Sequence, residues 1–194
     1  MTATAAPFGL RPAMQGSGGV LRPIRRAIDP TNTTAIYKGT PVQINAADGY
    51  VALATAGTPS GATNQVDGIF VGCEYYDSTG KYNVSPFWPG TSGCTNIVAW
   101  VIEDQQAIFE VQSAGSVAQS AIGNGLNLSA SPGTGSTLTG VSTATVTATP
   151  ISAALAQFVV VDVAQSEDNT WGDAYTIVRV KLAATKFAAN ITVQ

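Results

Sequence analysis

Histidine is missing from all 194 residues, and the chain contains only two cysteines. Without histidine, Ser-His-Asp and Cys-His catalytic arrangements are excluded, as is the commonest transition-metal ligand. Cys73 and Cys94 alone cannot build a structural zinc site, and we expect both to be reduced and packed. Glu103 and Glu110 remain the one candidate pair of glycosidase carboxylates. We therefore expect a protein that is not an enzyme, with no catalytic residues, no metal and no cofactor.

Charged residues are also scarce, at 11% of the chain against about 25% in ordinary soluble proteins. Because 45% of the residues are hydrophobic, this composition favours a folded chain whose surface is largely covered by neighbouring proteins. Long apolar runs are missing too, since stretches such as 97–102 and 158–161 are far shorter than the ~20 residues that span a bilayer. We expect no membrane contact, no secretory signal at the N-terminus, and synthesis in the cytosol.

Positive charge is concentrated near the N-terminus, where no acid precedes Asp29. Four of the nine cations lie there, which leaves five cations against twelve acids in the other 166 residues. The four are Arg11, Arg22, Arg25 and Arg26. They do not form the dense basic run that nucleic-acid binding requires, so an acidic protein surface is the expected partner.

Prolines divide the same region, with four of them in residues 1–30. Because this spacing excludes a helix, residues 1–30 are predicted to form an extended N-terminal arm. Phe8 and Leu10 are its candidate anchors. We expect the arm to be mobile when free and ordered on a partner, since ordering it costs on the order of 1–2 kcal/mol per residue. The alternative is a disordered tail without a role.

Residues 31–194 are predicted to form one all-β domain. Residues 96–112 read as two apolar strands joined by a polar turn at 103–106, paired as an antiparallel hairpin. A second hairpin turns at Asp48 and Gly49, and an alternating strand covers 173–182. A strand over 68–76 is interrupted at Gly72, which indicates a bulge or a close backbone approach. Eight to eleven such strands indicate an antiparallel β-barrel or sandwich.

Phe87 and Trp88 lie between two prolines on a predicted loop. Two adjacent aromatic rings are an unusual pair to leave in water, and three interpretations remain open. The rings can cap the end of the barrel, contact another subunit, or stack on a sugar.

Several short motifs occur in a characteristic order along the chain. They are FGLRP at 8–12, GTPV at 39–42, DGIFVG at 67–72, FEVQ at 109–112, GN at 123–124 and NTWGDA at 169–174. In this order they resemble the head decoration, or cement, proteins of tailed bacteriophages. The similarity runs through most of the chain, and it departs at 182–187 (LAATKF), where relatives carry Asn and His.

The resemblance implies a non-enzymatic structural protein of the virion, bound to the outside of the capsid and made in the host cytoplasm. Its implied partners are the major capsid protein and further copies of itself, as a homotrimer or a dimer. We expect the arm residues, and the Phe87 and Trp88 loop, to make these contacts. Two alternatives remain. One is a carbohydrate-binding or host-adhesion module that uses Phe87, Trp88 and Trp171. The other is a major capsid protein, although no stretch predicts its long helix.

Overall fold

The structure is a computed structural model that describes residues 4–60 and 63–187. The first three residues of the predicted arm, residues 61–62 and the end of the predicted domain at 188–194 lie outside this description. The fold is nearly all-β, and every ladder between its named strands is antiparallel. The predicted all-β class is therefore confirmed, as two antiparallel sheets, which is consistent with the predicted sandwich. No helix in the described part of the chain is long and apolar enough to cross a membrane.

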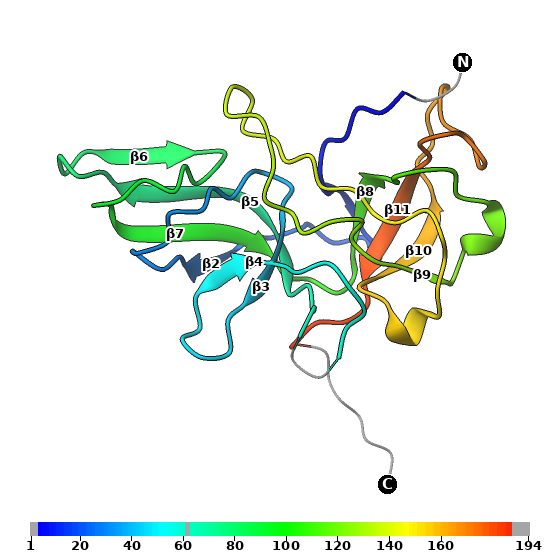
Figure 1. The fold of residues 1–194 in the computed structure, drawn as a ribbon, viewed down its shortest axis with the longest axis horizontal. Coiled ribbons are helices and arrows are strands. Elements are labelled where there is room, and N and C mark those ends of the chain that lie inside the picture. The colour runs from blue at the N-terminus through cyan, green and yellow to red at the C-terminus, as the bar shows by residue number, and fades with distance from the viewer. Residues whose placement is uncertain (1–3, 61–62, 188–194) are drawn as a thin grey trace, which may run out of the picture.

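The strands fall into two sheets that lie next to one another along the long axis of the molecule (Figure 1). Sheet A has the order β1-β8-β11-β10-β9. Its strands are β1 (Arg11–Gln15), β8 (Ala107–Gln112), β9 (Gly125–Leu126), β10 (Phe158–Val163) and β11 (Ile177–Leu182). Sheet B has the order β2-β7-β5-β3-β4, with β6 also paired to β5. Its strands are β2 (Ile24–Ala27), β3 (Pro41–Ile44), β4 (Val51–Leu53), β5 (Gly68–Tyr76), β6 (Tyr82–Ser85) and β7 (Thr95–Ile102).

Sheet B is inserted between two neighbouring strands of sheet A. The chain forms β1, builds all six strands of sheet B, and returns to pair β8 with β1. The Gly16 N–H donates to the Gln106 carbonyl over 2.8 Å, so the chain leaves and re-enters sheet A at one place. The predicted hairpin over 96–112 is therefore wrong: β7 and β8 form as strands but belong to different sheets, and residues 103–106 carry the chain across.

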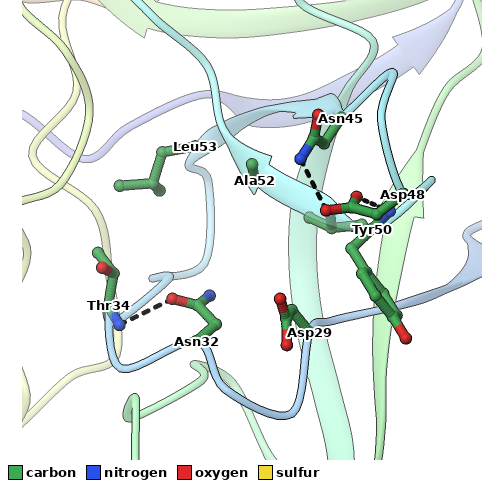
Figure 2. Close-up of a pocket in the computed structure, with 9 residues that line it drawn as sticks. Asp29, Asn32, Thr34, Asn45, Asp48, Tyr50, Ala52 and Leu53 are labelled. Carbon is green, nitrogen blue, oxygen red and sulfur yellow. Dashed lines mark hydrogen bonds between the residues drawn. The ribbon is translucent and has the colours of Figure 1, made fainter.

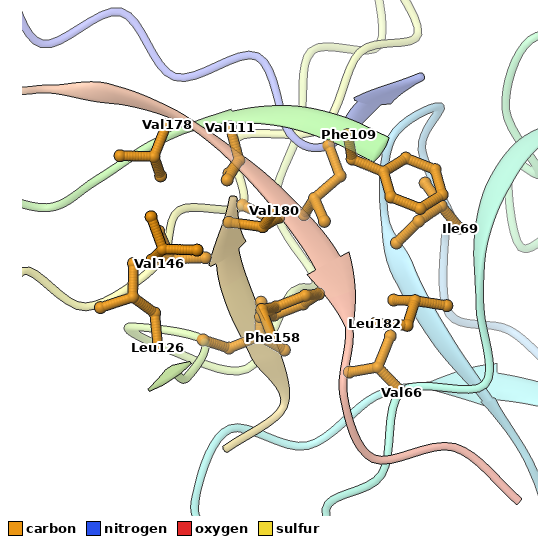
Figure 3. Close-up of a cluster of buried hydrophobic side chains, with 14 of the residues drawn as sticks. Val66, Ile69, Phe109, Val111, Leu126, Val146, Phe158, Val178, Val180 and Leu182 are labelled. Atoms are coloured by element: carbon orange, nitrogen blue, oxygen red, sulfur yellow. The ribbon is translucent and has the colours of Figure 1, made fainter. Parts of the chain in front are cut away.

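The larger hydrophobic core lies against sheet A (Figure 3). Phe109, Phe158 and Val180 are fully buried there, and Leu128 and Val146 from the segment after β9 cover them. In β11 the residues Val178, Val180 and Leu182 face inward while Arg179 and Lys181 face the other way, as the alternation predicts. Ile69 and Ile102, at the ends of β5 and β7, join the same cluster and fix sheet B to sheet A.

A second core lies within sheet B, around Phe70, Trp88 and Val101. Cys73 and Cys94 are both free and buried in it, in agreement with the predicted packed thiols. Burial is the main reason that the pKa of Cys73 rises to about 12. The predicted turn at Gly49 and the bulge between Phe70 and Gly72 are both present.

Candidate interaction site

The N-terminal arm is extended, but two of its segments belong to the sheets. β1 is the edge strand of sheet A and β2 is the edge strand of sheet B. Leu10 is fully buried in the larger core, and its N–H donates to the Gly39 carbonyl over 2.8 Å. The sequence predicts that a partner orders the arm. In the structure, ladder hydrogen bonds and the burial of Leu10 supply free energy that orders it within the fold. Leu10 is thus a core residue in the structure and not an exposed anchor.

Arg11 and Arg179 hold the same carboxylate from two sides. Arg11 Nη2 lies 2.6 Å from Glu110 Oε2, and Arg179 Nη2 lies 3.1 Å from Glu110 Oε1. Burial raises the pKa of Glu110, but hydrogen bonds from the two arginines lower it by more, so the pKa lies below its ordinary value of 4.5. A glycosidase acid needs the opposite shift, and Glu103 is likewise taken up by an arginine.

We predict that Glu110→Gln reduces the free energy of unfolding at pH 7 by about 1–3 kcal/mol, because two guanidinium groups lose their carboxylate. Since the pKa of Glu110 is lower in the folded chain, the stabilisation is present above about pH 4.5 and is lost as the pH falls through the folded value. Urea unfolding at pH 7 and pH 3 is the measurement. The gap between wild type and variant should shrink at the lower pH, and an unchanged gap would contradict the assignment.

Arg26 forms the most buried of the three ion pairs made by the described arm residues. Its Nε and Nη2 donate to the two oxygens of Glu103 over 2.7 and 2.6 Å, and the Glu103 side chain is only 5% exposed. Phe187 stacks on the guanidinium, with 5.1 Å from Arg26 Cζ to the ring centroid. Next to Phe187, Lys186 Nζ lies 3.6 Å from a carboxylate oxygen of the buried Asp67. The segment after β11 therefore contacts sheet B, at Arg26 of β2 and at Asp67 just before β5.

We predict that Arg26→Met costs about 2–4 kcal/mol of unfolding free energy, because it leaves the buried Glu103 carboxylate without its partner. The double variant Arg26→Met with Glu103→Leu should recover most of this loss, since no charge then stays buried. Guanidinium unfolding of the two single variants and the double variant measures the coupling. If the double variant loses the sum of the unfolding free energies lost by the two single variants, then Arg26 and Glu103 do not interact.

The remaining arm residues keep their charged or aromatic groups accessible. The Arg11 and Arg25 side chains are 63% and 61% exposed, although Arg25 also pairs with Glu74 over 2.6 Å. Arg22 is exposed on the connection between β1 and β2 and is in none of the ion pairs found among residues 4–60 and 63–187. Phe8 is half-buried under the Arg11 guanidinium, 5.0 Å from Arg11 Cζ to the ring centroid. Phe8, Arg11, Arg22 and Arg25 thus remain available to a partner.

Trp88 does not lie on the surface as a contact residue. It is fully buried in the core of sheet B, where Tyr75 meets it edge-on at 5.2 Å and its Nε1 donates to the Asn32 carbonyl over 3.3 Å. Phe87 stacks on Tyr37, with centroids 5.5 Å apart. Of the three interpretations, the structure supports capping of the fold for Trp88. The flanking prolines correctly indicate a loop, but they do not indicate which side of it faces the core.

Sheet B also carries a polar pocket of about 300 Å³ beside the β3–β4 hairpin (Figure 2). Asp48 accepts hydrogen bonds there from Asn45 Nδ2 over 2.8 Å and from the Tyr50 N–H over 3.0 Å. Asp29 and Asn32 face them from the segment after β2. Hydrogen bonds from Thr31 lower the pKa of Asp29, so this carboxylate is ionised at neutral pH. Sequence reasoning missed this pocket because its walls come from separate segments.

Comparison with protein-family models gives no match, and neither do comparisons with curated proteins and with solved structures.

Proposed function

We propose that this chain is a non-enzymatic structural protein of a bacteriophage head, which binds the outer surface of the capsid and stabilises the lattice as a cement protein. The observation that carries the proposal is the order of the six short motifs, from FGLRP at 8–12 to NTWGDA at 169–174. The all-β fold and the scarcity of charged residues support it. In this proposal the major capsid protein and further copies of the chain, as a trimer or a dimer, cover the surface.

The docking surface consists of the accessible arm residues Phe8, Arg11, Arg22 and Arg25. Their guanidinium groups suit an acidic capsid surface, because Arg forms paired hydrogen bonds with carboxylates. An oligomer that contacts several capsid subunits at once gains effective concentration, so each contact can be weak.

The two alternatives have less support. Trp88 is buried and Trp171 is partly buried against the core of sheet A, so neither presents a fully exposed ring to a sugar. Helix in residues 4–60 and 63–187 amounts to two single 3₁₀ turns, Gln119–Ala121 and Ala153–Leu155. A major capsid protein has a long spine helix, so it would need far more helix than these two turns.

The test uses phage heads stripped of the protein and incubated with the purified chain before sedimentation. We expect wild-type chain to sediment with the heads and Arg22→Glu to bind more weakly, with a smaller salt dependence, because one ion pair is lost. Lys81→Glu is the matched control, since Lys81 is an exposed cation on the β5–β6 turn. Failure of the wild-type chain to bind heads would refute the proposal, and equal effects of the two variants would refute the docking surface.

A further inference from the structure

Three tyrosines line a groove on sheet B that includes Arg25 but none of the other proposed docking residues. The groove has a volume of about 590 Å³, and Tyr50, Tyr76 and Tyr82 contribute to its walls. Tyr76 and Tyr82 are 40% and 49% exposed, so each ring keeps an open face. Arg25, Glu74 and Asn96 supply its polar groups.

Contacts among these side chains hold the rings in place before any ligand arrives. Glu74 accepts a hydrogen bond from Arg25 over 2.6 Å and one from the Tyr82 hydroxyl over 2.8 Å. The rings of Tyr76 and Tyr82 lie 5.4 Å apart at 55°. Arg25 in turn lies over Trp100, 5.5 Å from the ring centroid. Such preorganisation reduces the entropy lost when a ligand binds.

The groove and the pocket beside the β3–β4 hairpin share one wall residue. Tyr50 lines both of them. The pocket adds the carboxylate and amide groups of Asp29, Asn32, Asn45 and Asp48 next to Tyr50 (Figure 2). A ligand in the groove can therefore contact tyrosine rings together with the polar groups of Arg25, Glu74 and Asn96.

We propose that this tyrosine groove binds a neutral oligosaccharide. Open tyrosine faces suit the C–H faces of sugar rings, and carboxylate, amide and guanidinium groups form paired hydrogen bonds with neighbouring hydroxyls. Arg25 is the only cation in either lining, and Glu74, Asp29 and Asp48 outnumber it, which disfavours phosphate, sulfate and nucleic acid. The residues differ from Phe87 and Trp88, and the inference does not depend on the proposed capsid binding.

The experiment presents the purified full-length chain to an immobilised set of neutral oligosaccharides built from glucose, mannose, galactose and N-acetylglucosamine. Any sugar that binds is then titrated by calorimetry. We expect the double variant Tyr76→Ala with Tyr82→Ala to bind about 5- to 150-fold more weakly, since two stacked rings at about 0.5–1.5 kcal/mol each contribute about 1–3 kcal/mol together. Tyr82→Phe should keep most of the affinity because it keeps the ring. Tyr175→Ala, at a half-buried tyrosine outside the groove, should bind like wild type.

Thermal unfolding of each variant checks that it is folded. The proposal is overturned if no sugar in the set binds at millimolar concentration, or if the double variant binds as tightly as wild type. If no sugar binds and the double variant also loses head binding, the groove is a protein interface, which overturns the proposal too. Head binding by the wild-type chain is scored separately, so failure here leaves the proposed function standing.

Discussion

Deletion of residues 1–28 is expected to unfold the protein. The truncation removes β1 and β2, so β8 and β7 each lose a neighbouring strand. It also removes Leu10 from the larger core, at a cost of about 2–5 kcal/mol, and Arg26 from the buried Glu103, at a further ~2–4 kcal/mol. Glu110 loses one of its two arginines as well. Together these losses approach or exceed the 5–15 kcal/mol by which folded proteins of this kind are stable.

Circular dichroism and thermal unfolding of the truncated chain test this prediction. We expect no cooperative transition, or one at a much lower temperature than in wild type. The control is a shorter deletion of residues 1–7, which leaves both strands and Leu10 in place and should unfold close to the wild-type temperature. If the chain without residues 1–28 unfolds cooperatively at the wild-type temperature, then the arm is not part of the fold.

Replacement of Trp88 by alanine is expected to lower the free energy of unfolding by about 3–5 kcal/mol. The indole is fully buried between Tyr75 and the other residues of the sheet B core, and removing it leaves a cavity and an unpaired Asn32 carbonyl. Trp88→Phe should cost less, because the smaller ring fills part of the space.

Guanidinium unfolding of both Trp88 variants gives these values, with Phe87→Ala as the comparison at the adjacent, half-buried ring. Phe87→Ala should cost less than Trp88→Ala, since only one of these two rings is wholly enclosed. Head binding by the folded fraction of Trp88→Ala should match wild type. A stable Trp88→Ala variant that fails to bind heads would place the indole in an interface instead.

Local patterns in the sequence predict much of the secondary structure correctly. Alternation places Val178, Val180 and Leu182 on one face of β11, and the hairpin turn and the bulge in β5 follow from glycines at particular positions. These features depend on residues a few positions apart. The pattern therefore contains the information that determines them.

Pairing between distant strands could not be predicted in the same way. β1 pairs with β8 across an insertion that contains all of sheet B. No pattern of neighbouring residues indicates which distant strand β1 pairs with. The same limit explains the error over 96–112, where two apolar strands joined by a short turn look like a hairpin. Glu110 is covered in the same way by residues distant in the sequence, since arginines from β1 and β11 hold its carboxylate.

In the candidate site, too, local features were predictable from the sequence and contacts between distant residues were not. The arginines of the arm stand out from the charge distribution, but their carboxylate partners lie 49 to 99 residues away and emerge only from the fold. The tyrosine groove has no sequence signal of its own, because Tyr50 comes from one hairpin and Tyr76 and Tyr82 from another.

A density map of the intact virus particle tests the central proposal most directly. Electron cryomicroscopy of heads that carry the chain should show density for both sheets on the outer capsid surface, at the lattice symmetry positions, with Arg11, Arg22 and Arg25 facing the capsid subunits. A map with the chain inside the head, or with no copy of it on the head, would contradict the account.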